Sequence, residues 1–141
     1  MKLGGCMESE LEMLKLIEKY DRKVKEVIHQ MCVDFNVKSK EDFIEKKSKY
    51  INGELTINSS RTYIFHGRGC RVYDENQNEI VEWDFGYNNL WYGIDPFFLS
   101  RFIELNDSNN TYRNFKETTD TLNKMVSHGK LYKKSNLYYL T

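Results

Sequence analysis

The 141-residue sequence predicts an α+β protein. In the expected architecture, an antiparallel three- to four-stranded meander packs against a long N-terminal helix and two C-terminal helices, and the chain ends in a hairpin. Apolar residues of the first third recur every three or four positions, the period of an amphipathic helix. Between Leu55 and Gly86 the period changes to two, as in strands. Helical periodicity returns from Pro96 to His128, before a short aromatic tail.

Length and composition further narrow the class of protein that the sequence can encode. The chain fits a single domain over residues 1–141, with residues 1–8 expected to be flexible. Ten Tyr, eight Phe and two Trp exclude a disordered chain. Three cysteines without C-x-x-C spacing argue against a disulfide framework or a zinc knuckle. No signal peptide and no apolar run of membrane-spanning length is evident, so we expect a cytoplasmic protein without membrane contact. We also expect no cofactor, and the few, scattered His and Cys residues predict no metal site.

Two helices are predicted in the first third of the chain, at about residues 9–34 and 40–50. Ser9 and Glu12 have the spacing of a capping box, and Ser39 caps the second helix. The apolar face of the first helix is expected to contain Leu11, Leu14, Ile17, Val24, Val27, Ile28 and Met31. We expect this face to pack on the protein's own sheet. The alternative is a helix that binds a partner or a second copy.

Three strands follow, predicted at about residues 61–66, 69–74 and 79–85. Their links are short and exclude crossovers, which favours a meander. Asp95-Pro96 is a helix start, with an acid at the N-cap and proline at the first helical position. The two C-terminal helices are predicted at about residues 96–105 and 114–127, and Gly129 ends the second. A final hairpin is expected to turn at residues 134–136.

The tight link between the first two strands combines a histidine, two glycines, an arginine and a cysteine in five positions, 66–70. If the hairpin brings His66 and Cys70 onto one face, the imidazole could activate the thiol as a nucleophile. Asp84 on the third strand could then orient His66, giving a small enzyme of acyl or thiol transfer. The structural alternative is an ordinary hairpin with a buried cysteine.

A binding role for the same link needs no nucleophile. Gly67 and Gly69 allow positive φ, so the backbone N–H groups around Arg68 could form an anion-binding nest, to which Arg71 would add charge.

The run His66-Gly67-Arg68-Gly69-Cys70, followed by Trp83-Asp84-Phe85-Gly86, resembles an uncharacterised family of small bacterial domains. The resemblance covers residues 60–105 and implies no established activity. In size and composition the chain is also similar to the immunity proteins encoded beside bacterial polymorphic toxins, which are cytoplasmic α+β domains. This second resemblance implies a protein-binding domain that neutralises a toxin by direct contact.

For such a partner, the acidic and aromatic centre of the chain is the expected contact surface. Residues 61–112 hold four basic and eight acidic residues, and acids would steer a basic toxin while Tyr and Trp supply binding energy. The residues expected to form this surface are Glu79, Glu82, Asp84, Tyr87, Trp91, Tyr92 and Asp95.

The tail carries the opposite charge, with six basic and two acidic residues in 113–141. A helix, a glycine and a lysine-bearing hairpin are similar to the recognition helix and wing of winged-helix DNA-binding proteins. Arg113, Lys116, Lys124, Lys130, Lys133 and Lys134 would then contact phosphate. Glu117 and Asp120 on the same helix count against this, so nucleic acid ranks below a protein as the expected partner.

Overall fold

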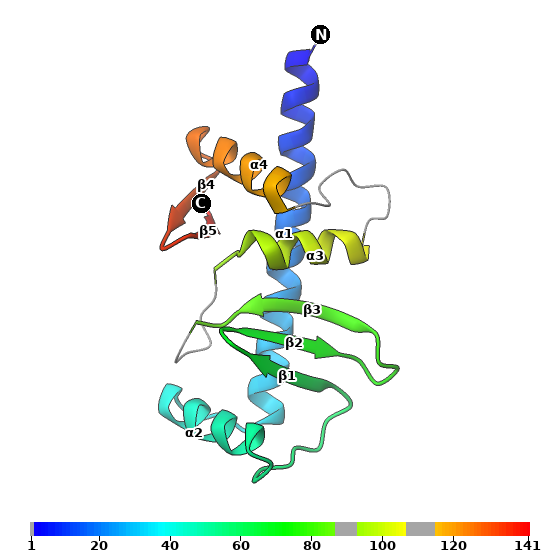
Figure 1. Ribbon diagram of the computed structural model, residues 1–141, viewed down its shortest axis with the longest axis vertical. Helices are drawn as coiled ribbons and strands as arrows, with labels where there is room; N and C mark the ends of the chain where they lie inside the picture. The colour runs from blue at the N-terminus through cyan, green and yellow to red at the C-terminus, as the bar shows by residue number, and fades with distance from the viewer. Residues whose placement is uncertain (1, 87–92, 107–114) are drawn as a thin grey trace. The chain divides into compact units, whose positions relative to one another are not determined.

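The computed structural model describes residues 2–86, 93–106 and 115–141, without the side chains of residues 2–9 (Figure 1). Within these ranges the elements run in the order α1 (Lys2–Asp34), α2 (Lys40–Ile51), β1 (Thr62–His66), β2 (Gly69–Tyr73), β3 (Glu79–Asp84), α3 (Pro96–Asn106), α4 (Phe115–Ser127), β4 (Leu131–Lys134) and β5 (Leu137–Leu140). This order confirms the predicted α+β class.

The chain forms two compact units, and α1 contributes to both. Unit 1 contains residues 1–22 and 93–141, and unit 2 contains residues 23–92. The single domain expected from the sequence stays a prediction. None of the helices within the described ranges is long and apolar enough to cross a membrane.

Helix α1 buries a stripe whose members are spaced alternately by three and four residues. The stripe consists of Glu10, Met13, Ile17, Tyr20, Val24, Val27 and Met31. Leu11 was expected on this stripe but is 49% exposed, because it lies one residue, or about 100°, away from Glu10. Ser9 was expected to cap the helix, but α1 begins at Lys2 and continues through it.

In unit 2 the sheet has the order β1-β2-β3, and both pairs are antiparallel, as the meander requires. Helix α2 lies beside β1 (Figure 1), and the Tyr50 hydroxyl donates to the backbone carbonyl of Tyr63 at 3.1 Å. The predicted cap is confirmed, since the Ser39 hydroxyl accepts the Asp42 N–H at 3.0 Å.

One face of this sheet belongs to the core of unit 2. Alternation along the strands places six side chains on it: Tyr63, Phe65, Cys70, Val72, Val81 and Trp83. Phe35, which follows α1, packs edge-to-face on Tyr63 at 5.6 Å and on Phe65 at 6.2 Å between ring centroids. Asp34 adds a polar anchor, because its carboxylate accepts hydrogen bonds from Ser59 and Tyr63, both at 2.6 Å.

In unit 1 the two helices α3 and α4 meet through buried groups, and the Ser100 hydroxyl donates to Thr118 at 2.9 Å. The predicted start of α3 is confirmed, since Asp95 accepts the Phe97 N–H at 2.8 Å. Helix α4 ends at Ser127, and Gly129 follows its end as predicted, with φ +74°.

The predicted C-terminal hairpin is confirmed as β4 and β5. Its turn places Ser135 and Asn136 at positive φ, +53° and +68°, as a two-residue type I′ turn requires. Ile94, just before α3, forms an isolated antiparallel bridge with Tyr138 of β5, with N···O distances of 2.8 and 3.0 Å.

Candidate functional site

The turn between β1 and β2 fixes which side chains share a face. Gly67 and Arg68 form a two-residue loop in which only Gly67 has positive φ, +52°. The register therefore pairs His66 with Gly69 and Phe65 with Cys70. Because paired residues share a face and neighbours alternate, His66 and Cys70 project from opposite faces. The expectation that the imidazole and the thiol could share one face is wrong.

The environment of Cys70 also argues against a nucleophile. Its side chain is fully buried on the core face, in register with Phe65 and Trp83. Burial raises the pKa of the Cys70 thiol well above its ordinary value, and the charge of Glu82 raises it further. The thiol is therefore protonated at neutral pH and behaves as a small apolar core group.

The opposite face of the sheet carries charge. We call it the charged face, and it consists of His66, Arg68, Arg71, Glu79, Glu82 and Asp84. Arg71 lies directly opposite Glu82 in the β2–β3 register, and Gly69 lies opposite Asp84.

Each basic side chain of the charged face meets a carboxylate. His66 Nε2 contacts the Glu82 carboxylate, whose other oxygen lies 3.4 Å from a terminal nitrogen of Arg71. Arg68 pairs with Asp84 at 3.1 Å. Asp84 also accepts the Gly86 N–H at 2.8 Å. The acidic partner of His66 predicted from the sequence was Asp84, whereas the structure assigns this contact to Glu82.

Exposure divides the charged face by sign. The side chains of Glu82 and Asp84 are 1% and 2% exposed, whereas those of His66, Arg68 and Arg71 are 45%, 44% and 31% exposed. The expectation that Glu82 and Asp84 present an acidic surface to a partner is therefore wrong. These carboxylates lie beneath the basic groups because a buried charge is stable only when it is paired.

The remaining predicted site residues are placed elsewhere. Asp95 is half-buried and caps α3. Gly69 does not have the positive φ that the predicted anion nest needs, and the Arg68 carbonyl accepts the Phe85 N–H at 2.8 Å. Tyr87, Trp91 and Tyr92 lie outside the described residues.

Within the described ranges, no three His, Cys, Asp or Glu side chains are grouped so that they could hold a metal ion.

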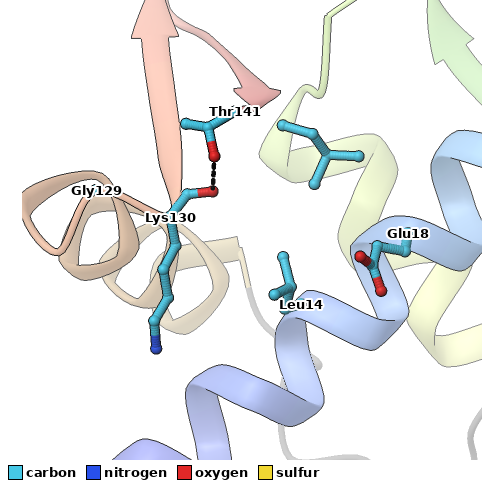
Figure 2. A pocket seen from close by; sticks show the side chains of 6 residues that line it. Leu14, Glu18, Gly129, Lys130 and Thr141 are labelled. Atoms are coloured by element: carbon cyan, nitrogen blue, oxygen red, sulfur yellow. Dashed lines mark hydrogen bonds between the residues drawn. The ribbon is translucent and has the colours of Figure 1, made fainter.

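A second polar cluster, which the sequence analysis missed, lies in unit 1. Glu10 of α1 is 6% exposed, and its carboxylate lies 2.9 Å from His128 Nδ1 and 3.2 Å from Lys130 Nζ. Close by is a pocket of about 370 Å³, lined by Leu14, Glu18, Gly129, Lys130, Leu140 and Thr141. In Figure 2 the Thr141 hydroxyl donates to the Lys130 carbonyl on one side of this pocket, at 3.3 Å.

This cluster joins the C-terminal hairpin region to α1 within unit 1. Glu10 offsets the charge of Lys130 and also contacts the imidazole of His128. No local signal marked Glu10, because both of its partners lie more than a hundred residues further along the chain.

Residues 13–140 match the profile of a family described as Domain of unknown function (DUF6896). The chain belongs to this family, and the match spans nearly all of both units. No curated protein and no solved structure matches the chain. The expected membership of an uncharacterised domain family is thereby confirmed. The resemblance carried by the run His66-Gly67-Arg68-Gly69-Cys70 and the likeness to immunity proteins stay predictions.

Proposed function

We propose that this chain is a protein-binding domain and that the charged face is its contact region. The observation that carries the proposal is the division of exposure by sign, with two buried carboxylates beneath three part-exposed basic side chains. Such an arrangement presents the N–H groups of the basic side chains, rather than the carboxylates, to a partner.

The pairing also prepares these side chains for binding. A free arginine loses rotamer entropy when a partner immobilises it, and a side chain already fixed by a buried carboxylate loses less. Arginine has five N–H donors in a planar fork, so Arg68 can pair with Asp84 and still donate to a partner's carboxylate. Arginine is also enriched among residues that dominate binding energy.

In its narrower form, we propose that the chain is an immunity protein that neutralises a toxin by direct contact, in the cytoplasm. The likeness in size and class supports this step. The chemistry of the charged face changes the expected partner, because its exposed groups are basic. The toxin surface should therefore present carboxylates, rather than the basic groups expected from the sequence.

The alternative of a Cys/His enzyme loses its main support. Cys70 is buried and protonated, and His66 lies on the other face of the sheet. Acyl or thiol transfer would need a thiolate that a substrate can reach.

The test is co-expression of the chain with the product of the neighbouring reading frame, scored by co-purification and by growth. We expect a stable complex and restored growth, with Arg68→Ala and Arg71→Ala each weakening affinity about 10-fold. Arg68→Lys keeps a charge beside Asp84 but removes the fork, so its loss of affinity cannot come from an unpaired carboxylate. Arg22→Ala, which removes an exposed arginine of unit 1, is the matched control.

Two outcomes would count against the proposal, each in a different way. If the two proteins neither co-purify nor restore growth, the immunity function is wrong. If growth is restored but the Arg68 and Arg71 variants behave like Arg22→Ala, the function stands and the charged face is not the contact region. Circular dichroism of each variant establishes that it is folded.

A further inference from the structure

Unit 1 has a chain order that the sequence alone did not reveal. The first part of α1 is followed by the bridge at Ile94, then by α3, α4, β4 and β5. The Ile94 bridge places one residue beside β5 through two backbone hydrogen bonds to Tyr138. With this bridge in the place of a first strand, the order of helix, bridge, helix, helix and hairpin is that of a winged-helix domain. The sequence suggested only the last helix and the hairpin.

The charge of the C-terminal segment is one-sided. Residues 121–141 contain four lysines and no aspartate or glutamate. Glu10 of α1 offsets one of these lysines, Lys130, together with His128. The other three, Lys124, Lys133 and Lys134, are exposed. The first half of α4 carries no excess of positive charge, because Lys116 pairs with Asp120 at 2.9 Å and Glu117 adds a second acid. The positive charge is therefore concentrated at the end of α4 and on the hairpin.

The β4–β5 hairpin carries one lysine on each of its two faces. Lys133 and Lys134 are neighbours on β4, so they project from opposite faces of the hairpin. Lys133 Nζ lies 5.2 Å from the centre of the Tyr138 ring, which steadies it on one face. The tip between the strands consists of Ser135 and Asn136, two small polar residues.

A narrow hairpin with a cation on each face and a polar tip complements a groove that has phosphates on both sides. Such a groove is a property of duplex nucleic acid, because each groove runs between two phosphate backbones. Ser and Asn side chains at the tip can add hydrogen bonds to phosphate or sugar oxygens. A flat acidic protein surface would meet only one of the two lysines.

We infer that unit 1 binds duplex DNA, with the β4–β5 hairpin in a groove and Lys124 at the end of α4 on the adjoining backbone. This inference goes beyond the proposed function, since it concerns other residues, in the other unit, and another class of partner.

The test measures fluorescence anisotropy of a labelled 20-base-pair DNA duplex with the full chain between 50 and 200 mM KCl. Three phosphate contacts predict a slope of about −3 in a plot of log affinity against log salt. Lys133→Ala combined with Lys134→Ala should reduce that slope to about −1 and weaken binding at 50 mM. Lys38→Ala combined with Lys40→Ala removes the same charge from exposed sites in unit 2 and should change neither quantity.

Three results would overturn the inference. They are absence of binding at 50 mM KCl, equal weakening by the two double variants, and equal affinity for polyglutamate of matched charge. The last would mean that the hairpin binds an acidic protein. Because Arg68 and Arg71 are intact in these variants, failure here leaves the growth and co-purification test of the proposed function unaffected.

Discussion

The carboxylate of Glu10 lies 2.9 Å from the imidazole of His128, although 118 positions separate the two residues in the chain. Lys130 contacts the same carboxylate. Glu10 occupies a position in the buried stripe of α1 that the helical pattern reserves for an apolar side chain. Its two basic partners make that position stable for a charge.

This pairing predicts an acid-sensitive contribution to stability. The hydrogen bond from His128 lowers the pKa of Glu10 below its ordinary value of 4.5, even though burial opposes the shift. A lowered pKa in the folded state gives stability that is present above the unfolded pKa and is lost as pH falls through the folded pKa. Glu10→Gln should therefore cost about 1–3 kcal/mol at pH 7, and much less well below pH 4. Urea unfolding at several pH values measures this.

The control for Glu10 is Glu12→Gln, two residues along the same helix and exposed. It should change the unfolding free energy little at any pH. An equal loss in both variants at pH 7 would show that the buried pair contributes no specific stability.

A methyl group at Gly93 is predicted to disrupt unit 1. A Cβ there would lie 2.7 Å from both Leu137 Cβ and the Tyr139 hydroxyl oxygen. Gly93→Ala should therefore destabilise the protein by about 1–3 kcal/mol through overpacking, and thermal unfolding would show this. Gly53→Ala is an informative comparison, because its Cβ would meet no atom within 4 Å and its cost comes only from φ +77°. Valine at position 93 is larger than alanine and should lower the free energy of unfolding further. Unchanged stability in Gly93→Ala would contradict the packing described here.

The thiol of Cys70 is predicted to be nearly inert in the folded protein. Burial raises the pKa of both Cys70 and Cys32, but Cys70 is fully buried whereas Cys32 is partly accessible. Alkylation by iodoacetamide at pH 8, followed by mass spectrometry, should modify Cys70 on the order of 100-fold more slowly than Cys32. The two rates should converge in 8 M urea, where the chain is unfolded. Rapid labelling of Cys70 in the native protein would restore the enzyme hypothesis.

Asp34 is predicted to be the main polar anchor between α1 and the sheet of unit 2. It accepts from Ser59, Tyr63 and Gln30, and these hydrogen bonds lower its pKa although burial acts in the opposite direction. Asp34→Asn removes the charge and replaces one acceptor oxygen by an NH2 donor, which must face either the Gln30 amide or the two hydroxyls, so we expect a loss of about 1–2 kcal/mol in urea unfolding. Asp120→Asn changes only an exposed pair and should cost far less. Equal losses would argue against the anchor.

Local signals accounted for much of the fold. The caps at Ser39 and Asp95, the glycine after α4 and the C-terminal turn all follow from the chemistry of a few adjacent residues. The stripe of α1 was harder, because Leu11, Met13 and Leu14 are all apolar and several phases fit them. Tyr20 falls on the same period between Ile17 and Val24, whereas the burial of the charged Glu10 depends on contacts with His128 and Lys130 that periodicity cannot predict.

For the candidate site, the sequence predicted which residues would be neighbours but not how their side chains are arranged. Residues 66–71 and 82–84 do come together, as the meander requires. Which face each side chain takes depends on the register, and one residue of shift exchanges the two faces. A two-residue loop sets His66 opposite Gly69, which sends Cys70 to the core. The separate register between β2 and β3 aligns Arg71 with Glu82. The acids are buried and the basic side chains are exposed, which is the opposite of the expectation. The spacing of residues in the sequence does not predict which of the two groups is buried.

The complete burial of Trp83 in unit 2 gives this protein a spectroscopic label of its own. Its indole N–H has no acceptor among the described residues, and an indole in so dry a setting emits at shorter wavelength than one in water. In a Trp91→Phe background, a red shift of this emission would report the opening of unit 2 alone. A ligand that binds the charged face should stabilise unit 2, so that the red shift occurs at a higher denaturant concentration. This measurement needs no dye or tag.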